Sequence, residues 1–210
     1  MKIYDISIDI NNETVVYPNN EPVNIQDFAK LPEASSNLSK ITFGSHTGTH
    51  VDAPKHTIAD GMTLNKIPLD HFVGDCKVFD FSYLQPGEGI KISDFEKSEM
   101  AVNAGDRVLV KTSNSERGFS EFHADFVYLD GDCADWLAEK HIALFGIDYL
   151  SVKQKGSDDH RAHDSILSKN IPILEGINLK EIIEDEYEIY CLPLKVDIDG
   201  APARTILVKR

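Results

Sequence analysis

The chain has 210 residues, of which 41% are hydrophobic and 27% are charged, and these values are typical of one globular domain spanning residues 1–210. Its net charge of −14 at pH 7 opposes binding to nucleic acid or to an anionic membrane surface, so we expect neither partner. Cys76, Cys133 and Cys191 form no paired motif, which favours free thiols in the cytoplasm.

Short β-branched runs dominate the chain and predict a strand-rich α/β fold. We expect strands at residues 3–10, 38–43, 76–81, 107–111, 143–147, 171–174, 187–192 and 205–208. Helical periodicity is weaker and predicts helices at residues 93–100, 132–141, 163–169 and 178–183. The first run lacks the apolar core of a signal peptide, and no segment approaches the roughly 18 apolar residues of a membrane span.

Histidines gather in one short segment that follows the second predicted strand. His46, His50 and His56 fall within eleven residues of one another, and Asp52 lies between them. Imidazole and carboxylate groups are the ligands of catalytic zinc, manganese and iron, whereas structural zinc sites usually include cysteine. The segment therefore predicts an open, reactive site for a divalent metal.

The spacing within this segment restricts its conformation. A straight strand would separate His46 from Asp52 by about 20 Å, which is too far for one coordination sphere. A helix is a poor alternative because the segment contains glycine, proline and β-branched residues. We expect the chain to leave strand 38–43 and to fold back in a compact loop, with Gly48 and Pro54 providing the turns.

One loop supplies at most three or four ligands, so further ligands must come from elsewhere in the chain. Glu175 follows the apolar run 171–174 and would sit at the carboxyl end of a buried strand, the usual place for ligand sites in α/β sheets. His160 and His163 precede it. The residues alone leave open which of these histidines contributes, and whether Glu175 is only a solvated strand end.

Residues 46–56 resemble the H-x-G-T-H-x-D-A-P-x-H signature of the cyclase-like metal-dependent hydrolases, a family that includes bacterial kynurenine formamidases and isatin hydrolases. The resemblance extends to residues 146–148, 173–176, 192–195 and 199–204, and so covers nearly the whole chain. It implies a swivelling β/β/α-type fold and a homo-oligomer, either a homodimer or a homotetramer.

The resemblance also implies two divalent ions per subunit, with zinc the first choice and manganese the second. Asp52 would contact both ions. The fifteen-residue spacing from His160 to Glu175 does not match the family pattern, so the resemblance favours His163. The implied ligands are His46, His50, Asp52, His163 and Glu175.

His56 matches the family's catalytic proton donor and acceptor. The expected reaction is attack of metal-bound hydroxide on a small amide, with His56 giving a proton to the leaving nitrogen. The chain lacks a G-x-S-x-G motif or a papain-like cysteine context, so we do not expect a serine or cysteine nucleophile.

The resemblance points to an arylformamidase acting on an N-formylkynurenine-type substrate, as in tryptophan catabolism. Tyr17 precedes Pro18 where the kynurenine formamidases typically carry tryptophan, and we expect this smaller ring to contact the substrate. A cyclic amide of the isatin type, or another small amide or ester, is the alternative. A metal-binding module without catalysis is the alternative from a different class, and the extra histidine His56 argues against it.

Overall fold

The computed structural model describes residues 1–210, and its main sheet closes into a barrel. The strands follow the order β1-β12-β11-β5-β7-β9-β10-β4, and β4 pairs again with β12, so seven strands form a ring to which β1 is added. The strands from β5 through β7 and β9 to β10 are parallel, and the other pairings are antiparallel. The bounds are β1 Lys2–Asp5, β4 His50–Asp52, β5 Val73–Phe81, β7 Arg107–Thr112, β9 Leu144–Ile147, β10 Ile173–Glu175, β11 Asp185–Pro193 and β12 Gly200–Lys209.

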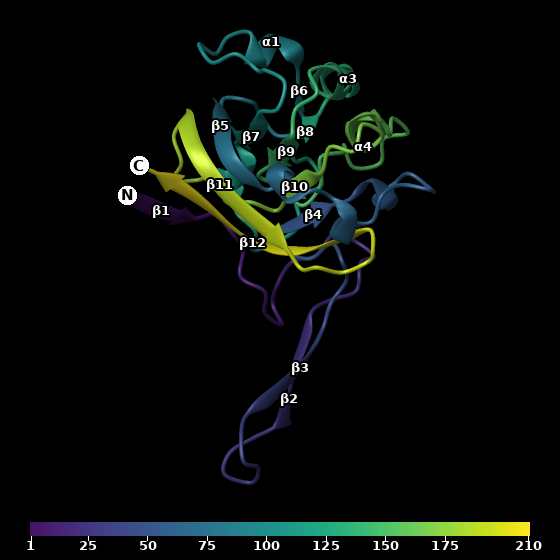
Figure 1. Ribbon diagram of the computed structural model, residues 1–210, viewed down its shortest axis with the longest axis vertical. Helices are drawn as coiled ribbons and strands as arrows, with labels where there is room; N and C mark the ends of the chain where they lie inside the picture. Colours follow the sequence, from purple (N-terminus) through teal and green to yellow (C-terminus); the bar gives the residue numbers. More distant parts are fainter.

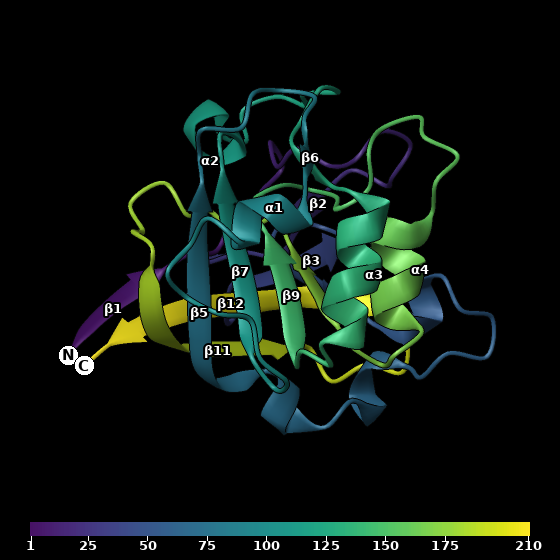
Figure 2. The same ribbon diagram turned by 90° about the horizontal axis from the view of Figure 1, so that it is seen from above.

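Two helices, α3 (Gly131–Glu139) and α4 (Arg161–Leu167), lie side by side next to β9 (Figure 2). The helices α1 (Ile92–Phe95) and α2 (Asn114–Arg117) are single turns, and β6 (Gly89–Ile90) pairs with β8 (Tyr128–Leu129). The short 3-10 helices are η1 Pro54–His56, η2 Leu64–Lys66 and η3 Leu69–His71. None of the helices has the length and apolar character needed to cross a membrane.

Alternation along the strands divides the core into two parts. Leu109 of β7 belongs to the cluster inside the barrel, whereas its neighbours Val108 and Val110 belong to the cluster under the helices. In β10, Leu174 packs inside the barrel and Ile173 packs toward the helices. Successive side chains of a strand point to opposite faces. A strand that lies between the two clusters is buried on both faces, and its sequence is therefore a continuous apolar run.

The hairpin of β2 (Asn24–Ala29) and β3 (Leu38–Thr42) projects away from the barrel as an arm (Figure 1). Every residue of β3 is exposed, and Phe28 of β2 is 74% exposed. The strand predicted at residues 38–43 therefore exists but lies outside the barrel, because strand propensity does not specify which surface a strand covers.

The strand-rich α/β prediction is confirmed, but some elements differ. The helix predicted at residues 178–183 is wrong, since this segment contains only turns. Leu179 and Ile182 both pack into the barrel interior, and their three-residue spacing imitates a helical face. The helix predicted at 93–100 is reduced to α1, and the strand predicted at 3–10 is reduced to β1. All three cysteines are buried and free.

Candidate metal centre

The site is built on β4, which lies between β10 and β12. His50 is opposite Glu175 in the antiparallel register, and Asp52 is opposite Ile173. Val51 points into the barrel interior, so His50 and Asp52 point to the outer face, where directly opposed Glu175 also lies. The pleat of two short strands thus gathers an imidazole and two carboxylates in one place.

The helix α4 brings a second imidazole onto this face. His163 lies on the buried side of α4 together with Ala162 and Ile166. Its Nε2 is 3.3 Å from Glu175 Oε1 and 3.7 Å from Asp52 Oδ2. His163 therefore joins the cluster, as the resemblance implied.

His160, the competing histidine, lies elsewhere. It is the N-cap residue of α4 and is exposed, and its Nδ1 is 3.3 Å from Lys153 Nζ. No ion pair joins it to the carboxylates of the cluster.

The loop before β4 folds back as expected and carries His46 to Asp52. Gly48 turns the chain with a φ of +61°, a conformation that favours glycine. Gly200 allows the imidazole of His46 to lie against β12. A Cβ at this position would be only 2.9 Å from His46 Cε1, which is too close for two carbon atoms that are not bonded. His46 Nδ1 consequently lies 2.7 Å from Asp52 Oδ1.

Two buried acceptor atoms of this cluster have no hydrogen-bond partner. His50 Nδ1–H donates to the Gly48 carbonyl at 2.9 Å, which leaves Nε2 with a lone pair. That Nε2 and Asp52 Oδ2 are both buried and unpartnered. Buried polar atoms without partners are costly, and a cation would satisfy both of these atoms. The nitrogen and oxygen donors of the cluster therefore fit a divalent metal.

Burial and charge act against each other in the cluster. Burial disfavours the charged form of His46, but Asp52 and Asp199 outweigh it and raise the pKa of His46 to about 9. Burial also opposes ionisation of Asp52, yet the neighbouring histidines, His46 first, hold the pKa of Asp52 below its usual range. The carboxylate of Asp52 is thus kept ionised by positive charge, and either a proton or a cation can supply that charge.

His56 lies at the edge of the cluster and is reachable from solvent. The turn η1 directs it back toward His46, with ring centroids 4.1 Å apart. Its side chain is 30% exposed, and burial lowers the pKa of His56. An imidazole that is partly open to solvent beside the candidate metal ligands is suited to proton transfer.

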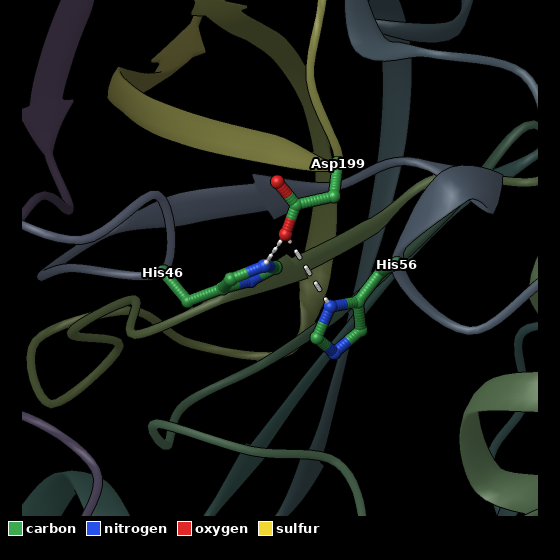
Figure 3. A group of neighbouring side chains, drawn as sticks. All are labelled: His46, His56 and Asp199. Atoms are coloured by element: carbon green, nitrogen blue, oxygen red, sulfur yellow. Dashed lines mark hydrogen bonds and ion pairs between the residues drawn. The ribbon is translucent and has the colours of Figure 1, made fainter. Parts of the chain in front are cut away.

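Asp199 is a member of the site that the sequence reasoning missed. It precedes β12, and its Oδ2 lies 2.7 Å from His46 Nε2 and 3.8 Å from His56 Nδ1 (Figure 3). The only sequence signal was its place in the segment 199–204, to which no role was given. The closure of the barrel places Asp199 here, because Gly200 pairs with Asp52.

Tyr17, the residue expected to contact the substrate, is half-buried and packs on residues outside the cluster. Burial and the negative charge of Glu175 both raise the pKa of Tyr17. Its ring packs edge-to-face on Phe122 at 5.2 Å, and Lys155 Nζ lies 4.9 Å from the ring centroid. The charge of Glu175 therefore affects Tyr17, but the contacts of the Tyr17 ring are with Phe122 and Lys155.

Comparisons of the sequence with known proteins find a matching family model and similar full-length relatives. The Cyclase family model, described as "Putative cyclase", matches residues 4–154. A kynurenine formamidase from Bacillus anthracis is 33% identical over 208 residues, which cover 98% of this chain and 97% of the relative. Another kynurenine formamidase, from Salinibacter ruber, is 34% identical and covers 99% of this chain and 97% of its own length.

Solved structures are also similar to this chain over nearly its whole length. One described as a predicted metal-dependent hydrolase from Bacillus stearothermophilus is 34% identical, with a TM-score of 0.84 over 98% of this chain and 97% of that chain. An isatin hydrolase is 19% identical, with a TM-score of 0.87 over 100% of this chain and 93% of that chain, and this likeness concerns the fold alone. The expected swivelling β/β/α-type fold is confirmed.

Proposed function

Because the chain belongs to the cyclase family of metal-dependent hydrolases, we propose that it is an arylformamidase acting on a small N-formyl arylamine of the N-formylkynurenine type. One observation carries this proposal. His50 Nε2 and Asp52 Oδ2 are buried without partners, whereas His56 stands beside them and open to solvent. A site that only stored metal would have no use for that additional histidine.

Five residues would hold the metal. His46, His50 and Asp52 would bind one ion, and Asp52, His163 and Glu175 would bind a second. We propose zinc as the metal, with manganese as the second choice. This assignment is supported by Asp52, whose two oxygens face different histidines: Oδ1 faces His46 and His50, and Oδ2 faces His163. When bound, a divalent metal acidifies a coordinated water and polarises a carbonyl group.

The protein's own residues would position the substrate and move the proton. Tyr17 would contact the aryl ring through its own aromatic face. In the reaction, the oxygen of a water molecule adds to the formyl carbon and the carbon–nitrogen bond breaks. His56 would accept a proton from that water and deliver it to the leaving nitrogen, so that formate and an arylamine are released.

Metal analysis of the purified protein, followed by assays with the metal found, tests the proposal. We expect hydrolysis of N-formylkynurenine or formanilide that is lost on chelation and restored by zinc or manganese. Turnover of isatin alone would replace the substrate class with cyclic amides. Bound metal without turnover of any of these compounds would contradict catalysis and favour the metal-binding module.

Metal binding should depend on pH because protons compete for His46. The pKa of His46 is about 9 in the metal-free chain, so at pH 7 a proton must leave before a cation binds. We expect the apparent affinity for zinc to rise about tenfold per pH unit from pH 7 to about 9. Isothermal titration calorimetry measures this, and an affinity that does not change with pH would contradict it.

The same shift affects the stability of the metal-free protein. The pKa of His46 is raised from 6.5, so its protonated form stabilises the fold below about pH 6.5, and this contribution is lost as the pH rises through about 9. The melting temperature of the metal-free protein should therefore fall across this range.

We also propose that the protein is a homo-oligomer that uses the β2–β3 arm. An isolated two-stranded hairpin is marginally stable in water, yet this arm exposes large apolar side chains, namely Phe28, Leu31, Leu38 and Ile41. A second copy of the chain would cover them. Multi-angle light scattering should give a mass of two or four chains, and Phe28→Ser with Ile41→Ser should lower it. A monomeric wild-type protein would contradict the proposal.

A further inference from the structure

We propose that Asp199 is a positioning residue that, through a single carboxylate oxygen, sets the orientation of both His46 and His56. This inference rests on the proposed function, because it assigns the two histidines to metal binding and to proton transfer. Asp199 contacts both imidazoles with Oδ2, and Figure 3 shows the two rings converging on that atom.

The backbone and side chain of Asp199 are both held in place. Ala53 directly follows β4, and its backbone N–H donates to the backbone carbonyl of Asp199 at 2.8 Å. The Ser45 hydroxyl donates to Oδ2 at 3.2 Å. Gly200 then begins β12 and pairs with Asp52. The carboxylate is therefore tied to the two segments that carry His46 and His56, and it can act as a fixed reference point for both rings.

For His46, Asp199 determines which nitrogen is free to bind a cation. His46 Nε2 and Asp199 Oδ2 are 2.7 Å apart, and His46 Nδ1 faces Asp52 at 2.7 Å. An Nε2–H donated to Asp199 leaves Nδ1 directed at the cluster. Metal-binding histidines generally donate their other ring N–H to a carboxylate or carbonyl, which sets their tautomer and orientation. His50 follows the same rule with the Gly48 carbonyl.

For His56, Asp199 is the carboxylate that lies within 4.0 Å of a ring nitrogen. The distance from His56 Nδ1 to Asp199 Oδ2 is 3.8 Å, which is an electrostatic contact and longer than a hydrogen bond. Figure 3 shows the other ring nitrogen of His56 turned away from Asp199. A carboxylate beside Nδ1 favours the proton on Nδ1, so Nε2 is the nitrogen left to exchange a proton with the substrate.

The matched comparison is Asp199→Asn against Asp197→Asn. Asp197 lies two residues earlier, and its Oδ1 contacts the Thr63 hydroxyl at 2.6 Å, away from the histidines. Both variants remove one negative charge from the same turn. In the metal-free protein at about pH 10, above the pKa of about 9 at which His46 loses its second proton, nitrogen-15 NMR of the imidazoles should show changed tautomer signals for His46 and His56 in Asp199→Asn and wild-type signals in Asp197→Asn.

Metal affinity and kinetics complete the test. In Asp199→Asn we expect the dissociation constant for zinc to rise by about tenfold or more, because the ring of His46 is no longer oriented. At saturating metal we expect kcat to fall by about tenfold or more, with KM within about twofold of wild type, because the proton-transfer geometry at His56 is lost. If Asp199 only stabilised the fold, the tautomer signals of the folded Asp199→Asn variant would match the wild type, and kcat would not fall while KM stayed unchanged.

Each opposing result has a definite meaning. Wild-type zinc affinity and tautomer signals in Asp199→Asn would overturn the role at His46. A wild-type kcat at saturating metal would overturn the role at His56. The NMR and affinity measurements need no substrate. If the wild-type protein hydrolyses none of the tested amides, the proposed function is refuted. The role of Asp199 at His46 is then still decided by these two measurements.

Discussion

Replacing Asp52 by asparagine is expected to remove metal from the protein and to lower turnover on the order of 10³-fold or more. Asp52 is fully buried, and its oxygens face His46, His50 and His163. Asparagine keeps the shape of the side chain but removes the charge, and its NH₂ group cannot bind a cation. One proposed metal position would therefore lose its ligand atom, and the other would keep only an uncharged amide oxygen.

The control for this change is Asp60→Asn, which removes an exposed carboxylate from the turn that follows η1. It should leave metal content and turnover at wild-type levels. Metal content is measured by mass spectrometry after dialysis, and circular dichroism verifies that each variant is folded. A folded Asp52→Asn protein that retains its metal would show that the cluster is not the metal site.

Replacing His56 by alanine is expected to lower kcat by about 10²- to 10⁴-fold while metal content stays near the wild-type value. The structure supports this separation of roles. His56 has its side chain 30% exposed at the rim, whereas His50 and Asp52 are buried. Removing His56 opens space at the surface of the site and takes away the group that would supply the proton to the leaving nitrogen.

The matched control is His160→Ala, because His160 is an exposed histidine that contacts Lys153 and not the cluster. It should keep wild-type kcat and metal content. If His56→Ala instead lost its metal, His56 would belong among the ligands, for it lies close enough to Asp52 and His163 to share an ion with them. Normal turnover in His56→Ala would refute its role in proton transfer.

The residues that the site uses were largely predictable because of their chemical type and local spacing. Three histidines and an aspartate within eleven residues form an unusual concentration of metal-binding groups, and Gly48 marks the turn that brings His46 back. Glu175 was visible as the polar end of an apolar strand, but the residues alone left open whether it is a solvated strand end, and the resemblance implied its place in the site. The choice of His163 over His160 came from the resemblance, and the buried face of α4 supplies its physical reason.

Other parts of the molecule could not be predicted from local patterns. The run at residues 38–43 has the composition of a strand, yet it forms an exposed arm, because strand propensity is the same inside and outside a barrel. The segment 178–183 has helical spacing, yet it forms turns whose apolar residues fill the barrel interior. In both cases distant parts of the chain determined the outcome.

The sequence by itself determined that residues 46–56 form a loop rich in candidate metal ligands, and it determined most of the strands whose apolar runs are buried in the barrel. The resemblance implied that His163 and Glu175 meet that loop, but only the tertiary structure decided how they are placed there and that Asp199 joins them. The physical reason is that β4 is three residues long and gains its partners from β10 and β12, which come from much later in the chain. Register between such strands places Glu175 opposite His50 and Asp199 beside His46, and no local sequence pattern encodes that register.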